Sequence, residues 1–157
     1  MPAALLAMAL LTGAAMVWDC TRLARDARER VEWADAEMRK HEERLVGIVT
    51  GSAGVPPEVG DAVAAYREAG DVEERHEAYS DLVAACRGTM VPGLDPTHPL
   101  DRKLMDDVAG AMNRREIAEA TYAAELAGYR KFAGGICGRV AGRFSPACCG
   151  PPPSPGE

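Results

Sequence analysis

Aromatic residues are scarce in this sequence of 157 residues, which contains two Trp, four Tyr and two Phe. Runs of Val, Ile and Thr, which are typical of strands, are also few, whereas Ala is abundant. These shortages argue against a sheet and favour helices that pack through small side chains. The length suits one folded unit better than two. We therefore predict an all-α protein.

The sequence also lacks the patterns of several functional classes. Its formal net charge is −6, and no basic cluster has aromatic residues along it, so nucleic acid is not an expected partner. It has no Gly-x-Ser-x-Gly elbow. Gly51-Ser52-Ala53-Gly54 is not followed by Gly-Lys-Ser/Thr and does not form a phosphate-binding loop. We expect no catalytic residue and no cofactor.

Cysteine is present, but not in the spacing of a metal site or a disulfide framework. The five cysteines are Cys20, Cys86, Cys137, Cys148 and Cys149. Their number is odd, no Cys-x-x-Cys pair repeats, and no His lies at zinc-finger spacing. We predict reduced thiols, because a helical bundle of this size needs no disulfides.

Charged side chains are absent from residues 2–18, which are rich in Leu, Met and Ala. As a helix this segment rises about 26 Å, which is near the lower limit for crossing a bilayer. Arg22, Arg25, Arg28 and Arg30 follow it, so the positive-inside rule predicts an external N-terminus and a cytoplasmic domain. We predict a transmembrane anchor over residues 1–19. A signal peptide cleaved near Gly13-Ala14-Ala15, with export of the remainder, and a buried core helix are the alternatives.

Apolar residues at alternating steps of four and three predict one helical seam over residues 27–49. The seam consists of Ala27, Val31, Ala34, Met38, His41, Leu45 and Ile48. The opposite, polar face consists of Arg28, Glu29, Glu32, Asp35, Glu42 and Glu43. A single apolar stripe needs partner helices to cover it. We expect this helix to continue from the anchor and to end near Thr50, before glycines and prolines.

Glycine and proline divide the remaining sequence into further helices. One begins after Pro57, weakens at Gly70-Asp71 and ends at Gly88, and a surface crossover follows at Met90–Pro99. The apolar pattern returns over residues 100–140 and predicts a last long helix. Residues 20–144 would thus form the bundle, and the proline-rich residues 145–157 a disordered tail.

Arg115 lies on the apolar seam of the last predicted helix. It could pair with Glu37, Glu42 or Glu73 inside the bundle, or extend its charged end to solvent. We predict the second arrangement, because long basic side chains commonly reach the surface from an apolar face.

Glu73 and His76 form one Glu-x-x-His, the spacing that ferritin-like bundles use for a metal pair. Such sites require a second copy and further carboxylates, and the last helix carries no His. We therefore interpret Glu73 and His76 as a solvated face and His41 as a structural residue. A metal-binding or redox-sensing bundle that uses Glu73, His76 and His41 remains the alternative function.

Two motifs are similar to signatures of the LemA family. The segment from Asp35 to Val49, with Met38, Arg39 and Leu45, resembles the family's Asp-Val-Gln-Leu-Lys-Arg-Arg-x-Asp-Leu-Ile-Pro-Asn-Leu-Val. The second motif resembles Glu-Asn-Arg-Ile-Ala with its downstream tyrosines, and it consists of Asn113, Arg114, Ala118, Tyr122 and Tyr129. Val46-Gly47 replaces the family's Pro-Asn, and Ala123 and Arg130 replace its asparagines.

The resemblance implies a membrane-anchored, antiparallel four-helix bundle and no catalytic residue. We expect a scaffold or protein-interaction module with the membrane as one partner, through residues 2–18, and a protein as another. A homo-oligomer is compatible with the same pattern.

Overall fold

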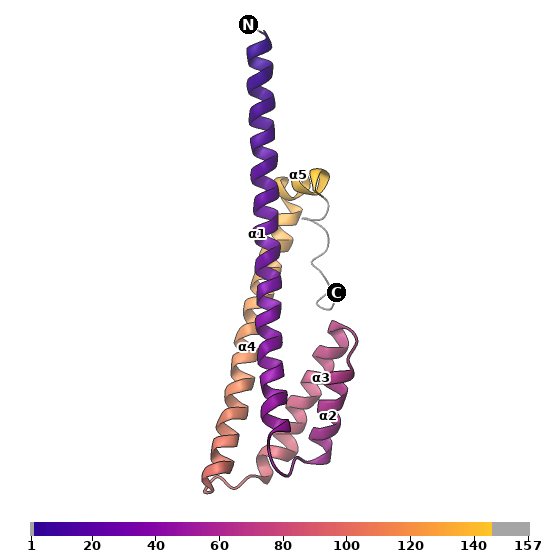
Figure 1. Ribbon diagram of the computed structural model, residues 1–157, viewed down its shortest axis with the longest axis vertical. Coiled ribbons are helices and arrows are strands. Elements are labelled where there is room, and N and C mark those ends of the chain that lie inside the picture. The colour runs from indigo at the N-terminus through magenta and orange to yellow at the C-terminus, as the bar shows by residue number, and fades with distance from the viewer. Residues whose placement is uncertain (1, 146–157) are drawn as a thin grey trace. The chain divides into compact units, whose positions relative to one another are not determined.

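The computed structural model describes residues 2–145, and this part of the chain is helical. The elements are α1 (Pro2–Thr50), α2 (Pro57–Glu68), α3 (Val72–Ala85), a π-helical turn η1 (Cys86–Met90), a 3₁₀ turn η2 (Val91–Gly93), α4 (Pro99–Gly134) and α5 (Ile136–Phe144) (Figure 1). Helices contain 89% of the described residues, and none of these residues is in a strand. The all-α prediction is confirmed. Of the predicted tail, only Ser145 is described, so Cys148 and Cys149 lie outside the described residues.

The described chain divides into two compact units, each of which contains parts of α1 and α4. Unit 1 comprises residues 2–34 and 121–145, and unit 2 comprises residues 35–120. Unit 1 carries eight basic and five acidic residues, whereas unit 2 carries ten basic and eighteen acidic residues. The negative charge of the protein is therefore concentrated in unit 2.

The first helix ends at Thr50, where the sequence predicted its end. The Gly51 N–H donates to the Gly47 carbonyl at 3.0 Å and completes the last turn. Gly54 then adopts a φ of 73°, a conformation that favours glycine, and Pro56 follows. The chain therefore leaves the helix at the glycines and prolines of the sequence.

The second predicted helix forms as two helices, α2 and α3, separated at Gly70-Asp71 as expected. The Asp71 carboxylate caps α3 by accepting the Glu74 N–H at 2.9 Å, and the Glu74 carboxylate accepts the Gly70 N–H at 2.9 Å. After α3 the chain continues through η1 to Met90, beyond the predicted end at Gly88. Met90, expected at the edge of a surface crossover, is instead buried.

The last predicted helix is interrupted at Gly135, so that α4 and α5 replace one continuous helix over residues 100–140. The Gly135 N–H donates to the Phe132 carbonyl at 2.9 Å and ends α4. A Cβ atom on Gly138 would lie 2.5 Å from the carbonyl oxygens of both Phe132 and Ala133. Only glycine allows the first turn of α5 to fold this closely against the end of α4.

Each unit has its own apolar core. In unit 2, α1, α2, α3, η1 and α4 contribute, with Leu45, Val46, Val49, Val59, Ala62, Val63, Tyr79, Leu82, Cys86, Met90, Val108 and Ala111. In unit 1, α1 packs on α4 through Ala27, Val31 and Tyr129, and on α5 through Cys20, Ala24 and Ala141. Small side chains dominate the core of unit 1, as the Ala-rich composition predicted.

The predicted seam of α1 is confirmed for its apolar residues, but the predicted polar face is wrong at one position. Ala27, Val31 and Leu45 are among its buried members. Glu42, assigned to the solvated face, is only 1% exposed, whereas His41 is half-buried. Helices pack on more than one side of α1 in unit 2, and a straight helix also drifts relative to a 3.5-residue repeat. The buried face therefore widens to include position 42.

Candidate functional site

A buried carboxylate lies at the centre of unit 2 and contacts three other helices. We call Glu42 on α1, Tyr66 on α2, Arg75 on α3 and Arg115 on α4 the Glu42 cluster. The Tyr66 hydroxyl donates to Glu42 Oε2 at 3.1 Å, and Arg115 Nε donates to Glu42 Oε1 at 3.3 Å. Arg75 Nε lies 3.7 Å from Glu42 Oε2. Both carboxylate oxygens are therefore neutralised by groups from other helices.

Arg115 connects the Glu42 cluster to neighbouring side chains. Besides Glu42, it pairs with Glu119 one turn further along α4. Its Nη2 atom lies 3.0 Å from His76 Nδ1, and its guanidinium carbon lies 4.8 Å from the centre of the Tyr79 ring. The prediction that Arg115 extends to solvent is wrong, because this guanidinium is buried among Glu42, Glu119 and an aromatic face that attracts cations.

Arg115 also contacts the imidazole of His76. A guanidinium can only donate hydrogen bonds, so in this contact Arg115 Nη2 is the donor and His76 Nδ1 the acceptor. His76 is therefore connected through Arg115 to the carboxylates of Glu42 and Glu119.

Two tyrosines pack against each other beside the buried carboxylate. Tyr66 and Tyr79 meet edge to face, with ring centres 6.3 Å apart. Burial and the Glu42 carboxylate raise the pKa of Tyr66 well above its usual range, so its hydroxyl remains a donor to Glu42. Burial raises the pKa of Tyr79 to about 12, although Arg115 opposes this shift.

An open pocket of about 260 Å³ lies between α3 and α4, next to the Glu42 cluster. It is lined by His76, Tyr79, Ser80, Val83, Arg87, Met112, Arg115, Glu116 and Glu119. Basic, acidic and apolar groups alternate on its wall, so it has no uniform charge. The Tyr79 hydroxyl is buried without a hydrogen-bond partner in the described structure.

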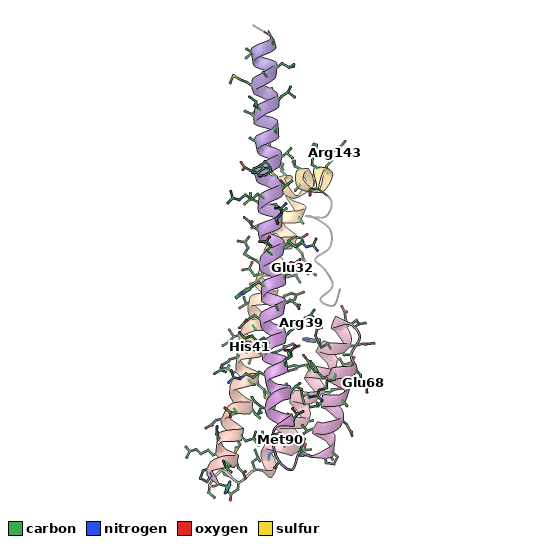
Figure 2. The ribbon with its side chains drawn as sticks, in the orientation of Figure 1. Glu32, Arg39, His41, Glu68, Met90 and Arg143 are labelled. Atoms are coloured by element: carbon green, nitrogen blue, oxygen red, sulfur yellow. The ribbon has the colours of Figure 1, made fainter. Side chains whose placement is uncertain are left out.

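The three metal candidates are not brought together. Glu73 and His76 are exposed on α3, and His76 faces Arg115. His41 lies on α1, where its Nε2 atom is 3.4 Å from Glu37 Oε1 (Figure 2). Among residues 2–145, no group of three or more His, Cys, Asp or Glu side chains is placed to hold a metal ion. The described cysteines, Cys20, Cys86 and Cys137, are free thiols.

Most residues of the first LemA-like motif have packing roles. Met38 and Leu45 are buried, and Asp35 pairs with Arg39 at 2.9 Å along one face of α1. In the second motif, Tyr129 is buried and Tyr122 half-buried, whereas Asn113 and Arg114 are exposed.

The buried pair of Glu42 and Arg115 is the feature that the seam pattern missed. A signal was present in the sequence, because Arg115 interrupts an apolar face, and an arginine that is buried on such a face requires a charged partner. Glu42 directly follows the seam residue His41, so the periodicity assigned it to the polar face and did not predict its burial.

Comparison with known proteins gives no relative for this arrangement. No protein-family model, no curated protein and no solved structure matches this chain.

Proposed function

We propose that this protein is a membrane-anchored, non-enzymatic helical scaffold of the LemA type. In this proposal the N-terminal part of α1 crosses the bilayer, the N-terminus is outside and the rest of the chain is a cytoplasmic antiparallel bundle. The observation that carries the proposal is the exposure of the apolar start of α1.

This stretch has the composition of a core helix but is not covered by the described chain. An 18-residue window of α1 has a mean hydropathy of 1.7, yet only 6% of it is buried. Its exposed large side chains are Leu5, Leu6, Met8, Leu10, Leu11, Met16 and Trp18. Burying one such side chain is worth about 1.5–3 kcal/mol, so together they favour an apolar environment by on the order of 10 kcal/mol. A bilayer supplies that environment.

The charges that follow support the orientation. Arg22, Arg25, Arg28 and Arg30 lie within the next three turns of α1. Basic residues next to a membrane span are retained on the cytoplasmic side.

The Glu42 cluster supports a structural role for the bundle. A general base needs an accessible lone pair close to a substrate, whereas both oxygens of Glu42 already face the cations or hydroxyl of three other helices. The eighteen acidic residues of unit 2 favour a protein partner with a basic surface.

Membrane fractionation tests the anchor. The full-length protein should sediment with membranes, resist alkaline carbonate and be released by detergent. Leu10→Arg with Leu11→Arg should release it, because two charges in the centre of the span cost about 5 kcal/mol or more. Leu100→Arg is the matched control, since Leu100 is an equally exposed leucine on α4.

Two outcomes would contradict the proposal. A wild-type protein that stays soluble without detergent has no anchor. A mature protein whose N-terminus lies beyond residue 13, measured by mass spectrometry, was processed as an exported protein.

A further inference from the structure

Helix α5 has exposed side chains at both ends and along its basic side that the fold of unit 1 does not cover. Cys137, Val140 and Ala141 face inward and pack against α1. Ile136 is 67% exposed and Phe144 is 64% exposed, and Arg139 and Arg143 are also exposed. Two large apolar side chains and two arginines are therefore presented outward on a helix of nine residues.

The position of α5 along α1 is fixed by these same contacts. Its inner face packs on Cys20 and Ala24, and Cys20 lies two residues after Trp18, a rise of about 3 Å. Figure 1 shows α5 as a short helix beside α1 that turns away from the end of α4. Helix α5 is therefore attached to α1 immediately after the exposed apolar stretch.

Residues 126–145, which include α5, carry a net positive charge, whereas the whole protein is negatively charged. No acidic residue occurs between residues 126 and 145, whereas Arg130, Lys131, Arg139 and Arg143 are basic. Arg143, labelled in Figure 2, lies near the end of α5. A protein of net charge −6 thus has a basic segment beside its apolar stretch.

We propose that α5 lies in the headgroup layer of the same membrane that the start of α1 crosses, with Ile136 and Phe144 inserted toward the acyl chains and Arg139 and Arg143 on anionic lipid phosphates. The inference rests on the proposed membrane anchor and adds a second membrane contact to it. The interfacial layer of one leaflet is about 5–8 Å thick, comparable to the radius of a helix with its side chains. An amphipathic helix with basic and bulky apolar residues binds in this layer.

Photocrosslinking in vesicles tests this placement with the full-length chain. Phe144 is replaced by p-benzoylphenylalanine, and the protein is reconstituted in phosphatidylcholine and phosphatidylglycerol vesicles. The same replacement at Trp18 reports on the anchor. The replacement at Trp33 is the aqueous control, because Trp33 is 61% exposed and lies fifteen residues further along α1. All three positions are exposed, so each variant should fold.

The expected result is a lipid adduct from positions 18 and 144 and none from position 33. In vesicles with phosphatidylglycerol, Arg139→Glu with Arg143→Glu should reduce the adduct from position 144 by at least about fivefold. In pure phosphatidylcholine the double substitution should have a smaller effect.

The controls distinguish the two proposals. Lipid adducts from position 18 without any from position 144 would overturn the placement of α5 and leave the anchor intact. Adducts from neither position would overturn both. Crosslinks from position 144 to a second copy of the chain, in place of lipid, would assign this face to oligomerisation and overturn the inference.

Discussion

The burial of a single carboxylate determines how four helical segments of unit 2 meet. Glu42 is enclosed by Tyr66, Arg75 and Arg115, each from a different helix. Forming such a cluster requires removing charges from water, so its net contribution to stability is small. Breaking it is costly, because the arginines remain buried without their partner.

Glu42→Ala should therefore lower the free energy of unfolding by about 3 kcal/mol. Urea titration of the full-length protein in mild detergent, followed by circular dichroism, measures this change. Glu43→Ala is the control, because Glu43 is the exposed neighbour on the same helix, and it should change stability by less than about 0.5 kcal/mol. Equal effects of the two substitutions would show that the cluster is not a structural centre.

The buried thiol of Cys86 makes stability depend on alkaline pH. Burial raises its pKa from 9.0 to about 11. The unfolded chain ionises first, so the contribution to stability is complete below pH 9 and is lost as the pH rises to 11. The free energy of unfolding should fall across this range, with Cys86 contributing about 1 kcal/mol per pH unit.

Comparison with Cys86→Ala isolates the contribution of the thiol. The pKa values of Tyr66 and Tyr79 are also raised, but both tyrosines are present in the wild-type protein and in the variant. In the variant, the free energy of unfolding should therefore fall less steeply between pH 9 and 11 than in the wild-type protein. An equally steep fall in both proteins would contradict the role of Cys86.

At the scale of elements, glycine and proline made most of the helix boundaries predictable. The ends of α1 and α2 follow from Gly51, Pro57 and Gly70, which act through local backbone geometry. The break at Gly135 was not predictable from periodicity, because the apolar pattern continues across it to Val140. The burial of Glu42 also depends on contacts between helices that are distant in sequence, and a pattern along one helix does not contain them.

The attachment of α5 depends on the absence of a side chain at Gly138. Gly138→Ala should destabilise α5 by about 1–3 kcal/mol, since its Cβ would collide with the carbonyl oxygens of Phe132 and Ala133. Hydrogen exchange of residues 136–144 measures the loss of protection, and alkylation of Cys137 should become faster.

A second glycine provides the matched control for this substitution. Gly128 lies inside α4 and has open space around it. Gly128→Ala should leave α5 unchanged and stabilise α4 by up to about 1 kcal/mol. A similar loss of α5 protection in both variants would contradict the steric explanation.

At the scale of the whole molecule, the two long helices α1 and α4 take part in two apolar cores that differ in the size of their side chains. The core of unit 2 contains large aliphatic side chains such as Leu45, Leu82 and Val108, whereas the contacts of unit 1 include Cys20, Ala24 and Ala27. Less apolar area is buried in unit 1, so it should open locally at lower free energy.

Hydrogen exchange along α4 tests this difference within a single helix. Amides near residues 126–133 should exchange at least about tenfold faster than those near residues 108–115. Glu42→Ala should reduce this contrast by lowering the protection of residues 108–115 alone. Uniform protection along α4 would mean that both units open together.

The continuity of α1 has a mechanical consequence in unit 1. Between Gly13 and Gly47 the helix contains neither glycine nor proline, and an uninterrupted ladder of backbone hydrogen bonds resists twisting. A torque that turns residues 3–18 about their axis would therefore rotate Ala27 and Val31 against Tyr129 instead of being absorbed by a hinge. The packing of Tyr129 on α1 would therefore report any rotation of residues 3–18 about the helix axis.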